Sequence, residues 1–346
     1  GSISLSRDAI MKVWEIPSFG LDNLSLVERP DPMAGPGQAV VRVTANAINY
    51  RDVMTVQGLY NPKQVLPLVP LSDAAGIVES VGEGVTRVKV GDRVATTFAQ
   101  NWISGPADRD RLRGTLGGPG DGTLAERVCV YAEGLVHIPD YLTDEEAATL
   151  PCAAVTAWNA IAVQRSLSAD ETLLVLGTGG VSIFALQLAK LRGARVIITS
   201  SSDEKLERAR ALGADHTINY RTTPKWWKEV RRLTDDVGVQ QVIEVGGAGT
   251  FDQSIRSCAI GAHVSLIGVL AGLGQSVDLV RVLMQNVRVQ GIIVGNRDAF
   301  ESMLRAMAAH EMRPVVDHSF AFGDAKAALA ALGEGRHFGK IVIRGT

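Results

Sequence analysis

The sequence has few cysteines, and they are widely scattered. Among its 346 residues there are three, Cys129, Cys152 and Cys258, and no two form a CxxC pair. This spacing excludes a disulfide framework and a cysteine-rich zinc module. We therefore expect a protein of the reducing cytoplasm.

The chain also lacks a charge bias and a long apolar run. Its 35 basic and 37 acidic residues are well mixed and leave a net charge of −2, so neither nucleic acid nor an anionic membrane is an expected partner. Hydrophobic residues make up 46% of the sequence, enough for a large core. The longest apolar stretches have only the length of strands, so no membrane span is expected.

The first ten residues read as an extension rather than as part of a domain. They show no secretory signal, and Gly1-Ser2 is typical of the remnant of an expression tag. We expect the natural chain to begin near Met11. The remaining length suggests about two domains.

A glycine-rich turn stands between an apolar strand and a helix in the middle of the chain. The strand is Thr172–Leu176, residues 181–192 read as the helix, and a second strand at 194–199 completes a βαβ unit. Glycines let the backbone approach a pyrophosphate, and the helix start offers free N–H groups and a positive dipole end. We therefore predict a dinucleotide site, rather than an ordinary turn, at Gly177, Thr178, Gly179, Gly180 and Val181.

The end of the second strand indicates which dinucleotide binds. Ser200 stands where NAD-binding proteins usually carry an acidic residue, and Ser201 and Lys205 follow it. Hydroxyl groups and an ammonium suit a 2′-phosphate, and Tyr220-Arg221 adds an aromatic face and a second cation. The alternative is that the serines only cap the helix beginning at Asp203. We predict NADP(H) in preference to NAD(H).

Two regions of different secondary structure surround this motif. From Met11 to about residue 133 the chain is rich in strands and turns, which favours a mostly antiparallel, barrel-like domain. From about residue 143 to 296, helices alternate with apolar strands, which favours a doubly wound parallel sheet. We expect the last strand, within 336–343, to return to the first domain. The predicted strands are 12–16, 24–29, 38–47, 75–81, 93–98, 172–176, 195–199, 216–218, 241–244, 263–267 and 289–294. The predicted helices include 144–150, 155–162, 181–192, 203–212, 225–234, 251–257 and 300–309.

Several motifs together resemble the medium-chain dehydrogenase/reductase superfamily. The resemblance covers about residues 11–344 and implies an α/β fold with a GroES-like, mostly β catalytic domain (11–150 and 298–346) and a Rossmann domain (151–297). It also implies an active-site cleft between them. The motifs are Asn49-Tyr50-Arg51-Asp52, residues 76–86 and 90–94, residues 150–158, the glycine turn, residues 211–215 and His337-Phe338-Gly339-Lys340.

The resemblance also allows a test for zinc. Zinc members of the superfamily place a cysteine where this chain has Asn49, a Gly-His-Glu where it has residues 71–73, and a third ligand at Cys152. One thiolate cannot hold a catalytic zinc, which takes about three protein ligands. Residues 95–122 also lack the cysteines of the structural zinc lobe. We predict a zinc-free enzyme similar to the quinone-oxidoreductase-like branch.

Without a metal, hydrogen-bond donors must stabilise developing negative charge on the substrate. The resemblance implies catalytic roles for Asn49, Asp52 and Tyr60, and Arg51 is a further candidate donor, although it stands where zinc members keep a small hydroxyl residue. The alternatives are that Arg51 and Asp52 pair with each other or with loop backbone, and that Tyr60 is a packing residue. Two further residues stay open: Trp102 lines a pocket or anchors its loop, and Cys152 is a buried apolar residue rather than a nucleophile.

Further cofactor contacts are implied by position in the family pattern. They lie at the carboxyl edge of the predicted Rossmann sheet, where cofactors bind, and in the C-terminal tail, whose side chains are expected to close over the cofactor. Ordinary turn geometry is the alternative for the glycines. The residues are Thr156, Gly246, Gly268-Val269-Leu270, Val294-Gly295-Asn296, Phe338 and Lys340.

We therefore predict an NADPH-dependent, zinc-free oxidoreductase that transfers hydride to quinones or activated alkenes and carbonyls. The alternatives are a metal-free alcohol or aldehyde dehydrogenase and a non-catalytic NADPH-binding sensor. The expected partners are a small-molecule substrate and a second copy of the chain. Edge pairing of the apolar segments 264–270 and 289–294 would form the homodimer.

Overall fold

The computed structural model describes residues 9–268, 270, 272, 274 and 276–346, so that Gly1-Ser2 and Val269 lie outside it. The chain forms two compact units. Unit 1 comprises the described part of residues 1–152 with 296–304 and 313–346, and unit 2 comprises 153–295, where described, and 305–312. Among the described residues, no helix combines the length and the apolar character needed to cross a bilayer.

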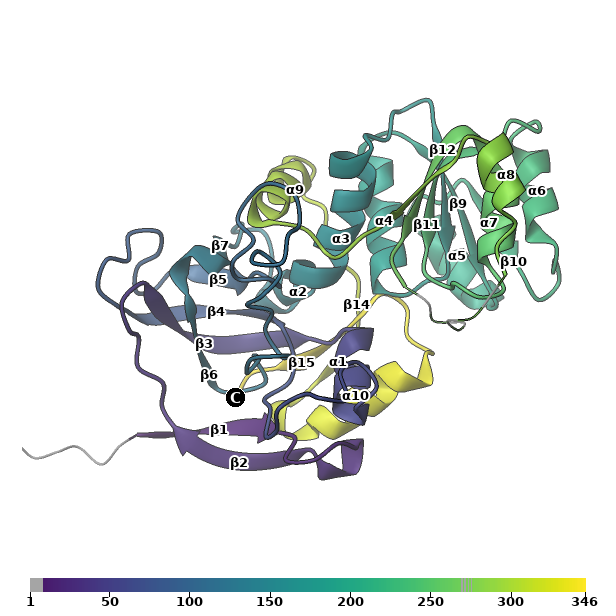
Figure 1. Cartoon of the computed structure of the whole chain (residues 1–346). Coiled ribbons are helices and arrows are strands. Elements are labelled where there is room, and N and C mark those ends of the chain that lie inside the picture. The colour runs from purple at the N-terminus through teal and green to yellow at the C-terminus, as the bar shows by residue number, and fades with distance from the viewer. Residues whose placement is uncertain (1–8, 269, 271, 273, 275) are drawn as a thin grey trace, which may run out of the picture. The chain divides into compact units, whose positions relative to one another are not determined.

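Unit 1 is built mostly on antiparallel strands, with β14 and β15 as a parallel pair (Figure 1). Its main sheet has the order β14-β15-β3-β4-β5-β7, with β6 also paired to β3, and β1 and β2 form a separate hairpin. The last strand pairs with β3, which confirms that the C-terminal tail returns to the first domain. The strands are β1 (Ile10–Glu15), β2 (Ser25–Pro30), β3 (Gln38–Ala47), β4 (Asp73–Val81), β5 (Arg93–Thr96), β6 (Arg127–Tyr131), β7 (Leu135–His137), β14 (Val316–Phe320) and β15 (Lys340–Arg344).

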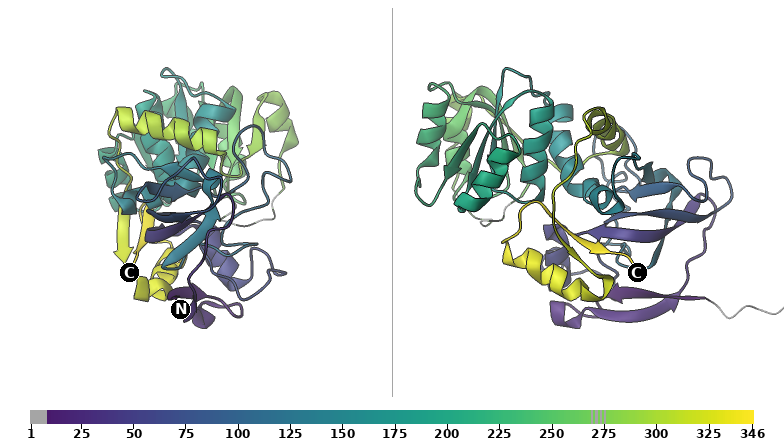
Figure 2. Two further views of the ribbon diagram at one scale, coloured as in Figure 1. Left: turned by 90° about the vertical axis from the view of Figure 1, so that its left-hand side faces the viewer. Right: turned by 180° about the vertical axis from the view of Figure 1, so that it is seen from behind.

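Helices that are distant in sequence meet at one end of unit 1. Helix α1 packs against α10, and Figure 2 shows them side by side. Ile48, Leu68, Leu329 and Ile341 belong to the apolar core formed there. The α-helices of this unit are α1 (Tyr50–Gln57), α2 (Asp144–Ala148), α10 (Ala325–Glu334) and the first part of α9 (Arg297–Ala309), whose last residues group with unit 2.

Unit 2 is a doubly wound parallel sheet, as predicted. Its strand order is β10-β9-β8-β11-β12-β13, so the winding direction reverses between β8 and β11. Helices α3 and α4 lie on one face of the sheet and α6, α7 and α8 on the other (Figure 1). The strands are β8 (Thr172–Leu176), β9 (Arg195–Ser200), β10 (His216–Asn219), β11 (Val239–Glu244), β12 (Cys258–Leu266) and β13 (Arg288–Gly291). The α-helices are α3 (Val155–Trp158), α4 (Gly180–Leu191), α5 (Asp203–Ala211), α6 (Trp226–Leu233), α7 (Phe251–Ser257) and α8 (Leu279–Met284).

Two segments of unit 2 differ from the prediction. The helix expected at 155–162 is α-helical only over α3, with π-helical turns η3 (Leu150–Ala154) before it and η4 (Asn159–Gln164) after it. Strand β13 ends at Gly291 rather than at Val294, where the backbone adopts a positive φ. Such π-turns are rare and occur often at functional sites.

Candidate functional site

The glycine turn of unit 2 has the geometry of a phosphate site. Gly177 adopts φ +77° directly after β8, and its N–H donates to the Thr199 carbonyl at 2.9 Å. A Cβ added at Gly177 or at Gly179 would meet no atom within 4 Å, so the turn is open beside its backbone. Gly179 is the N-cap of α4 and has no side chain to cap the first amides, which remain available for an anion. Thr178, Gly180 and Val181 complete the turn.

The position usually held by a third glycine is occupied by Ser182. Its side chain is buried, and its hydroxyl donates to the Leu176 carbonyl at 2.7 Å. The serine therefore ties α4 to β8 and keeps the close approach of helix and strand that the fingerprint needs.

The serines at and after the end of β9 have different roles. Ser202 caps α5, because its hydroxyl accepts from the Lys205 N–H at 3.2 Å. Ser200 is buried, its hydroxyl accepts from the Ser202 N–H, and its carbonyl accepts from the Tyr220 N–H at 3.1 Å. The structure thus gathers Ser200, Ser201, Lys205 and Tyr220 at the carboxyl edge of β9 and β10.

The loop after β11 is held by a buried carboxylate, Glu244, that the sequence analysis missed. Glu244 accepts from the Gly246 N–H and from the hydroxyls of Thr250 and Ser254, each at 2.9 Å. Burial raises the pKa of Glu244 and these hydrogen bonds lower it. The Leu270 N–H donates to Val245, so the predicted loop residues Gly246, Gly268 and Leu270 lie on one fixed edge. The sequence did offer one signal for this carboxylate: Glu244 ends an apolar strand shortly before Gly246 and Gly247.

A third part of that edge follows β13. Val294 has φ +48°, and Gly295 lies so close to α3 that an added Cβ would be 2.8 Å from Val155 Cγ1. Thr156 is buried in α3 between the two π-helical segments. Asn296 begins the next stretch of unit 1, where its amide donates to the Gly105 carbonyl at 3.0 Å.

Unit 1 contains a cluster of buried polar groups around Asn49. The Lys340 ammonium donates to Asn49 Oδ1 at 2.7 Å and to the Ile48 carbonyl at 2.6 Å. Asn49 and Lys340 are only 7% and 3% exposed. The amide nitrogen Nδ2 of Asn49 is buried and has no hydrogen-bond acceptor among the described residues. Its proximity to Asp73 partly opposes the rise in the pKa of that carboxyl group.

Asp73 is a buried carboxyl group of this cluster. Its carboxylate accepts from the Ser72 hydroxyl at 2.7 Å and from the Cys152 N–H at 3.0 Å. Burial raises the pKa of Asp73, and the Lys340 charge opposes that shift. Burial and the neighbouring Asp73 raise the pKa of Cys152 to about 12, so this side chain is a neutral thiol.

These residues do not fit a zinc ion. Asn49 Oδ1 accepts from an ammonium and the Ser72 hydroxyl donates to Asp73, which leaves Cys152 as the single thiol of this cluster. A catalytic zinc takes about three protein ligands. Within the described residues there is no group of three or more His, Cys, Asp or Glu side chains that could hold a metal.

Arg51 and Asp52, predicted as catalytic, both make contacts that support the framework of unit 1. Arg51 donates to the carbonyls of Leu116 at 2.9 Å and Gly118 at 3.2 Å, so its guanidinium holds that loop. Asp52 is fully buried, accepts from the Asn49 N–H at 2.7 Å and so caps α1. Arg51 thus pairs with Asp52 and with loop backbone, which is the alternative given in the sequence analysis.

Of four other predicted residues, one is exposed and three are buried. Tyr60 is 52% exposed, with its ring 5.4 Å from the Arg51 guanidinium. Trp102 is buried and donates to Gly105, so it anchors its loop. Phe338 and Lys340, predicted to close over the cofactor, are buried within unit 1.

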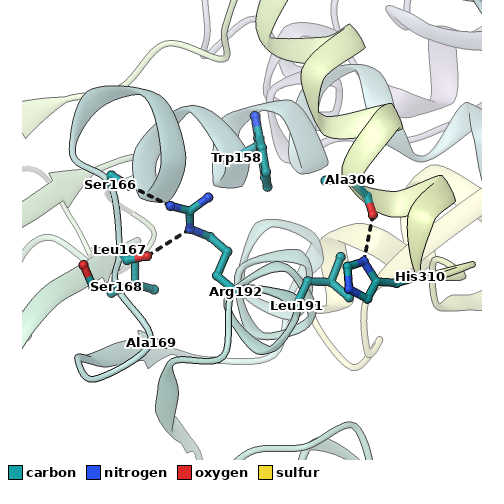
Figure 3. Close-up of a pocket in the computed structure, with 9 residues that line it drawn as sticks. All are labelled: Trp158, Ser166, Leu167, Ser168, Ala169, Leu191, Arg192, Ala306 and His310. Carbon is teal, nitrogen blue, oxygen red and sulfur yellow. Dashed lines mark hydrogen bonds between the residues drawn. The ribbon is translucent and has the colours of Figure 1, made fainter.

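A separate groove of about 520 Å³ lies in unit 2 beside the C-terminal end of α4, opposite its glycine turn. Figure 3 shows Arg192 between Trp158 and the loop that carries Ser166 and Leu167. Its guanidinium donates to the Ser166 hydroxyl at 2.6 Å and the Leu167 carbonyl at 3.0 Å, so its polar groups serve the fold. The groove is lined by Trp158, Ser166, Leu167, Ser168, Ala169, Leu191, Arg192, Ala306 and His310.

Comparison with known proteins matches both units. Residues 35–140 match the alcohol dehydrogenase GroES-like domain, and residues 180–309 match the zinc-binding dehydrogenase family. A zinc-type alcohol dehydrogenase-like protein from Schizosaccharomyces pombe is 42% identical, over 94% of this chain and 96% of its own length. An acryloyl-coenzyme A reductase from Metallosphaera sedula is 31% identical, over 84% and 86% respectively.

Solved structures agree with this assignment. A Sinorhizobium meliloti protein named as a candidate alcohol dehydrogenase has a TM-score of 0.92 and 41% identity, covering 98% of this chain and all (100%) of its own. A mycobacterial protein complexed with NADPH has a TM-score of 0.81 and 26% identity, covering 96% and 99%. The chain is therefore an NAD(P)H-dependent oxidoreductase that belongs to the medium-chain dehydrogenase/reductase superfamily.

Proposed function

We propose that this chain is an NADPH-dependent, zinc-free reductase of quinones or of alkenes conjugated to a carbonyl. The observation that carries the proposal is the Lys340–Asn49 pair in the place of a metal-binding group. An acceptor activated by conjugation needs no Lewis acid, only a donor for the oxygen on which charge develops. The relative named acryloyl-coenzyme A reductase supports the activated-alkene class.

Asn49 is the proposed donor to the substrate oxygen. Its Oδ1 accepts from Lys340, and its Nδ2, buried beside Asp73, has no hydrogen-bond acceptor among the described residues, so the N–H groups are what the amide can offer once a substrate reaches it. The ammonium polarises this amide and strengthens it as a donor. When bound, reduced nicotinamide supplies a hydride; the exposed Tyr60 hydroxyl is the proposed proton source.

NADPH is proposed over NADH because no acidic side chain ends β9. Ser200 and Ser201 stand there, with Lys205 one turn into α5 and Tyr220 at the end of β10. The neighbouring structure with NADPH supports the same choice. The scattered free cysteines favour a reducing compartment such as the cytoplasm.

The testing experiment is a panel of acceptors and alcohols with both nucleotides, on protein whose zinc content has been measured. We expect NADPH oxidation with quinones or enones, unaffected by a chelator, and weaker activity with NADH. Turnover of alcohols alone would favour a metal-free alcohol dehydrogenase; the name of the Schizosaccharomyces pombe relative supports the alcohol dehydrogenase class only. Tight NADPH binding without any turnover would favour a sensor, and stoichiometric zinc lost together with activity would refute the proposal.

We also propose a homodimer formed through β13. Of the two segments expected at the interface, β12 is internal, because it pairs with both β11 and β13. Strand β13 ends the sheet, and the neighbouring α8 presents Leu279, Val280, Leu283 and Met284, each at least 64% exposed. An open edge beside exposed apolar side chains is a typical protein interface.

A further inference from the structure

Val294 has an unfavourable backbone conformation for its residue type. Its φ is +48°, in the left-handed region, and its side chain is buried. A β-branched residue is a genuine outlier there, because its Cβ crowds the backbone. Such strain persists only where surrounding contacts hold it in place, and it often marks a functional site.

The contact that holds this residue comes from Asn159. Asn159 Nδ2 donates to the Val294 carbonyl at 2.8 Å, and the asparagine is 5% exposed. Asn159 begins the π-helical segment η4, directly after the helix that carries Thr156. The strained residue is therefore clamped to an irregular helical segment that is itself uncommon.

A chain of side-chain hydrogen bonds fixes which way the Asn159 amide points. Gln164 Nε2 donates to Asn159 Oδ1 at 3.0 Å, and Gln290 Nε2 donates to Gln164 Oε1 at 2.8 Å. His263 Nε2 lies 2.8 Å from Gln290 Oε1 and completes the chain as its donor. Since every amide oxygen accepts from the next side chain, Asn159 can present only its NH₂ group to Val294.

The packing of Gly295 leaves this turn little freedom. An added Cβ there would lie 2.8 Å from Val155 Cγ1 and 3.3 Å from Asn159 Cβ. The Val294-Gly295 backbone therefore rests directly on α3 and the start of η4. Asn159 thus restrains the turn both by a hydrogen bond and by contact.

The sheet order indicates which half of a bound dinucleotide would lie at the Val294-Gly295 turn. The pyrophosphate site is at the turn between β8 and α4, and the ribose-reading residues end β9. The adenosine half therefore extends toward β9 and β10. The nicotinamide half must extend the other way, toward β11, β12 and β13, and Val294-Gly295 follows β13.

We propose that Asn159 is a positioning residue for the nicotinamide half of the cofactor. By holding Val294 in the left-handed conformation, it aims the N–H groups of Val294 and Gly295 at the carboxamide oxygen. This inference rests on the proposed use of NADPH. The clamp is prepared before the cofactor binds, so its loss should weaken affinity for nicotinamide and not for phosphate or adenine.

The test compares two ligands by calorimetry: NADPH and 2′-phospho-ADP-ribose, which lacks only the nicotinamide. For Asn159→Ala we expect Kd for NADPH to rise at least about tenfold, while Kd for the fragment stays within about twofold. Asn159→Asp, which keeps the size and loses the donor, should behave alike. Asn23→Ala is the matched control, because Asn23 Nδ2 donates to the Phe19 carbonyl at 2.8 Å in unit 1; it should leave both constants unchanged.

A rescue separates positioning from general damage. Glycine adopts a positive φ without strain, so adding Val294→Gly to Asn159→Ala should restore NADPH affinity to within about threefold of wild type. Equal losses for both ligands, or no loss of NADPH affinity, would overturn the inference while NADPH use stands. Failure of the double variant to recover would also overturn it. Wild-type protein that binds neither ligand would refute the proposed function and this inference together.

Discussion

At the scale of single residues, one buried ammonium organises the polar cluster of unit 1. Lys340 binds Asn49 and the Ile48 carbonyl and faces the buried Asp73. Removing a buried cation costs far more than removing an exposed one, because the remaining carboxylate then lies unpaired away from water. The same side chain thus serves stability and the orientation of the proposed donor.

We predict that Lys340→Met lowers the free energy of unfolding by about 3–5 kcal/mol. Chemical denaturation followed by circular dichroism would measure the change. Lys326→Met is the matched control, since the exposed Lys326 donates only to the Asp22 carbonyl; it should cost no more than about 1 kcal/mol. Equal effects of the two substitutions would contradict a buried charge pair.

The buried Asp52 predicts a pH dependence of stability with an unusual sign. Burial raises the pKa of its carboxyl from 3.8 to about 6 in the folded chain. Between these values the folded state binds the proton more tightly, so the contribution of Asp52 falls as pH rises, by about 3 kcal/mol in all. Asp52→Asn should remove this slope in urea titrations at pH 4.5 and 7.

Asp92→Asn provides a control with the opposite sign. The Lys89 N–H and His137 hold the pKa of Asp92 below its ordinary value, so its stabilisation is present at neutral pH and lost as pH falls. The Asp92→Asn variant should therefore lose more stability at pH 7 than at low pH. Parallel pH profiles for wild type and both variants would exclude these assignments.

At the scale of elements, the glycine turn before α4 leaves its backbone open to a ligand. Gly179→Ala should fold normally, because a Cβ there meets nothing within 4 Å and φ is −76°. The methyl group would occupy the space of the pyrophosphate and lower NADPH affinity at least about tenfold. Gly323→Ala in unit 1 also adds a Cβ to open space and should leave binding unchanged, as calorimetry would record. Normal NADPH binding by the Gly179→Ala variant would contradict a phosphate site at this turn.

Elements held by local sequence signals could be predicted from the sequence. The predicted bounds 38–47, 172–176 and 251–257 are those of β3, β8 and α7, because strong apolar patterning and nearby glycines, prolines or charges mark their ends. The capped start of α1 was missed, although Asn49 and Asp52 are spaced as an N-cap and its third helical residue.

Features that depend on distant contacts could not be predicted. Lys340 was assigned to the cofactor, whereas its partner Asn49 lies 291 residues away in the sequence. Val294 was placed in a strand because valine favours strands, yet contacts with Asn159 hold it at a positive φ. Apart from the glycine turn that follows Glu244, nothing in the neighbouring sequence indicates that hydroxyl groups bind its carboxylate.

At the scale of the whole molecule, the open edge of β13 predicts a dimer that one charge should disrupt. Leu283 is 74% exposed on α8, and Leu283→Asp should give a folded monomer. Light scattering coupled to size exclusion would measure the mass. Met33→Asp, at an 89% exposed residue of unit 1, should leave the dimer intact. A monomeric wild type at micromolar concentration would refute the proposed interface.

The position of β15 has a consequence for how the chain matures on the ribosome. This strand is made after all the other described strands, yet it lies inside the unit 1 sheet between β14 and β3. All six strands of unit 2 are translated before it. A nascent chain can therefore complete its nucleotide-binding sheet while the older, N-terminal half still waits for the strand that closes it.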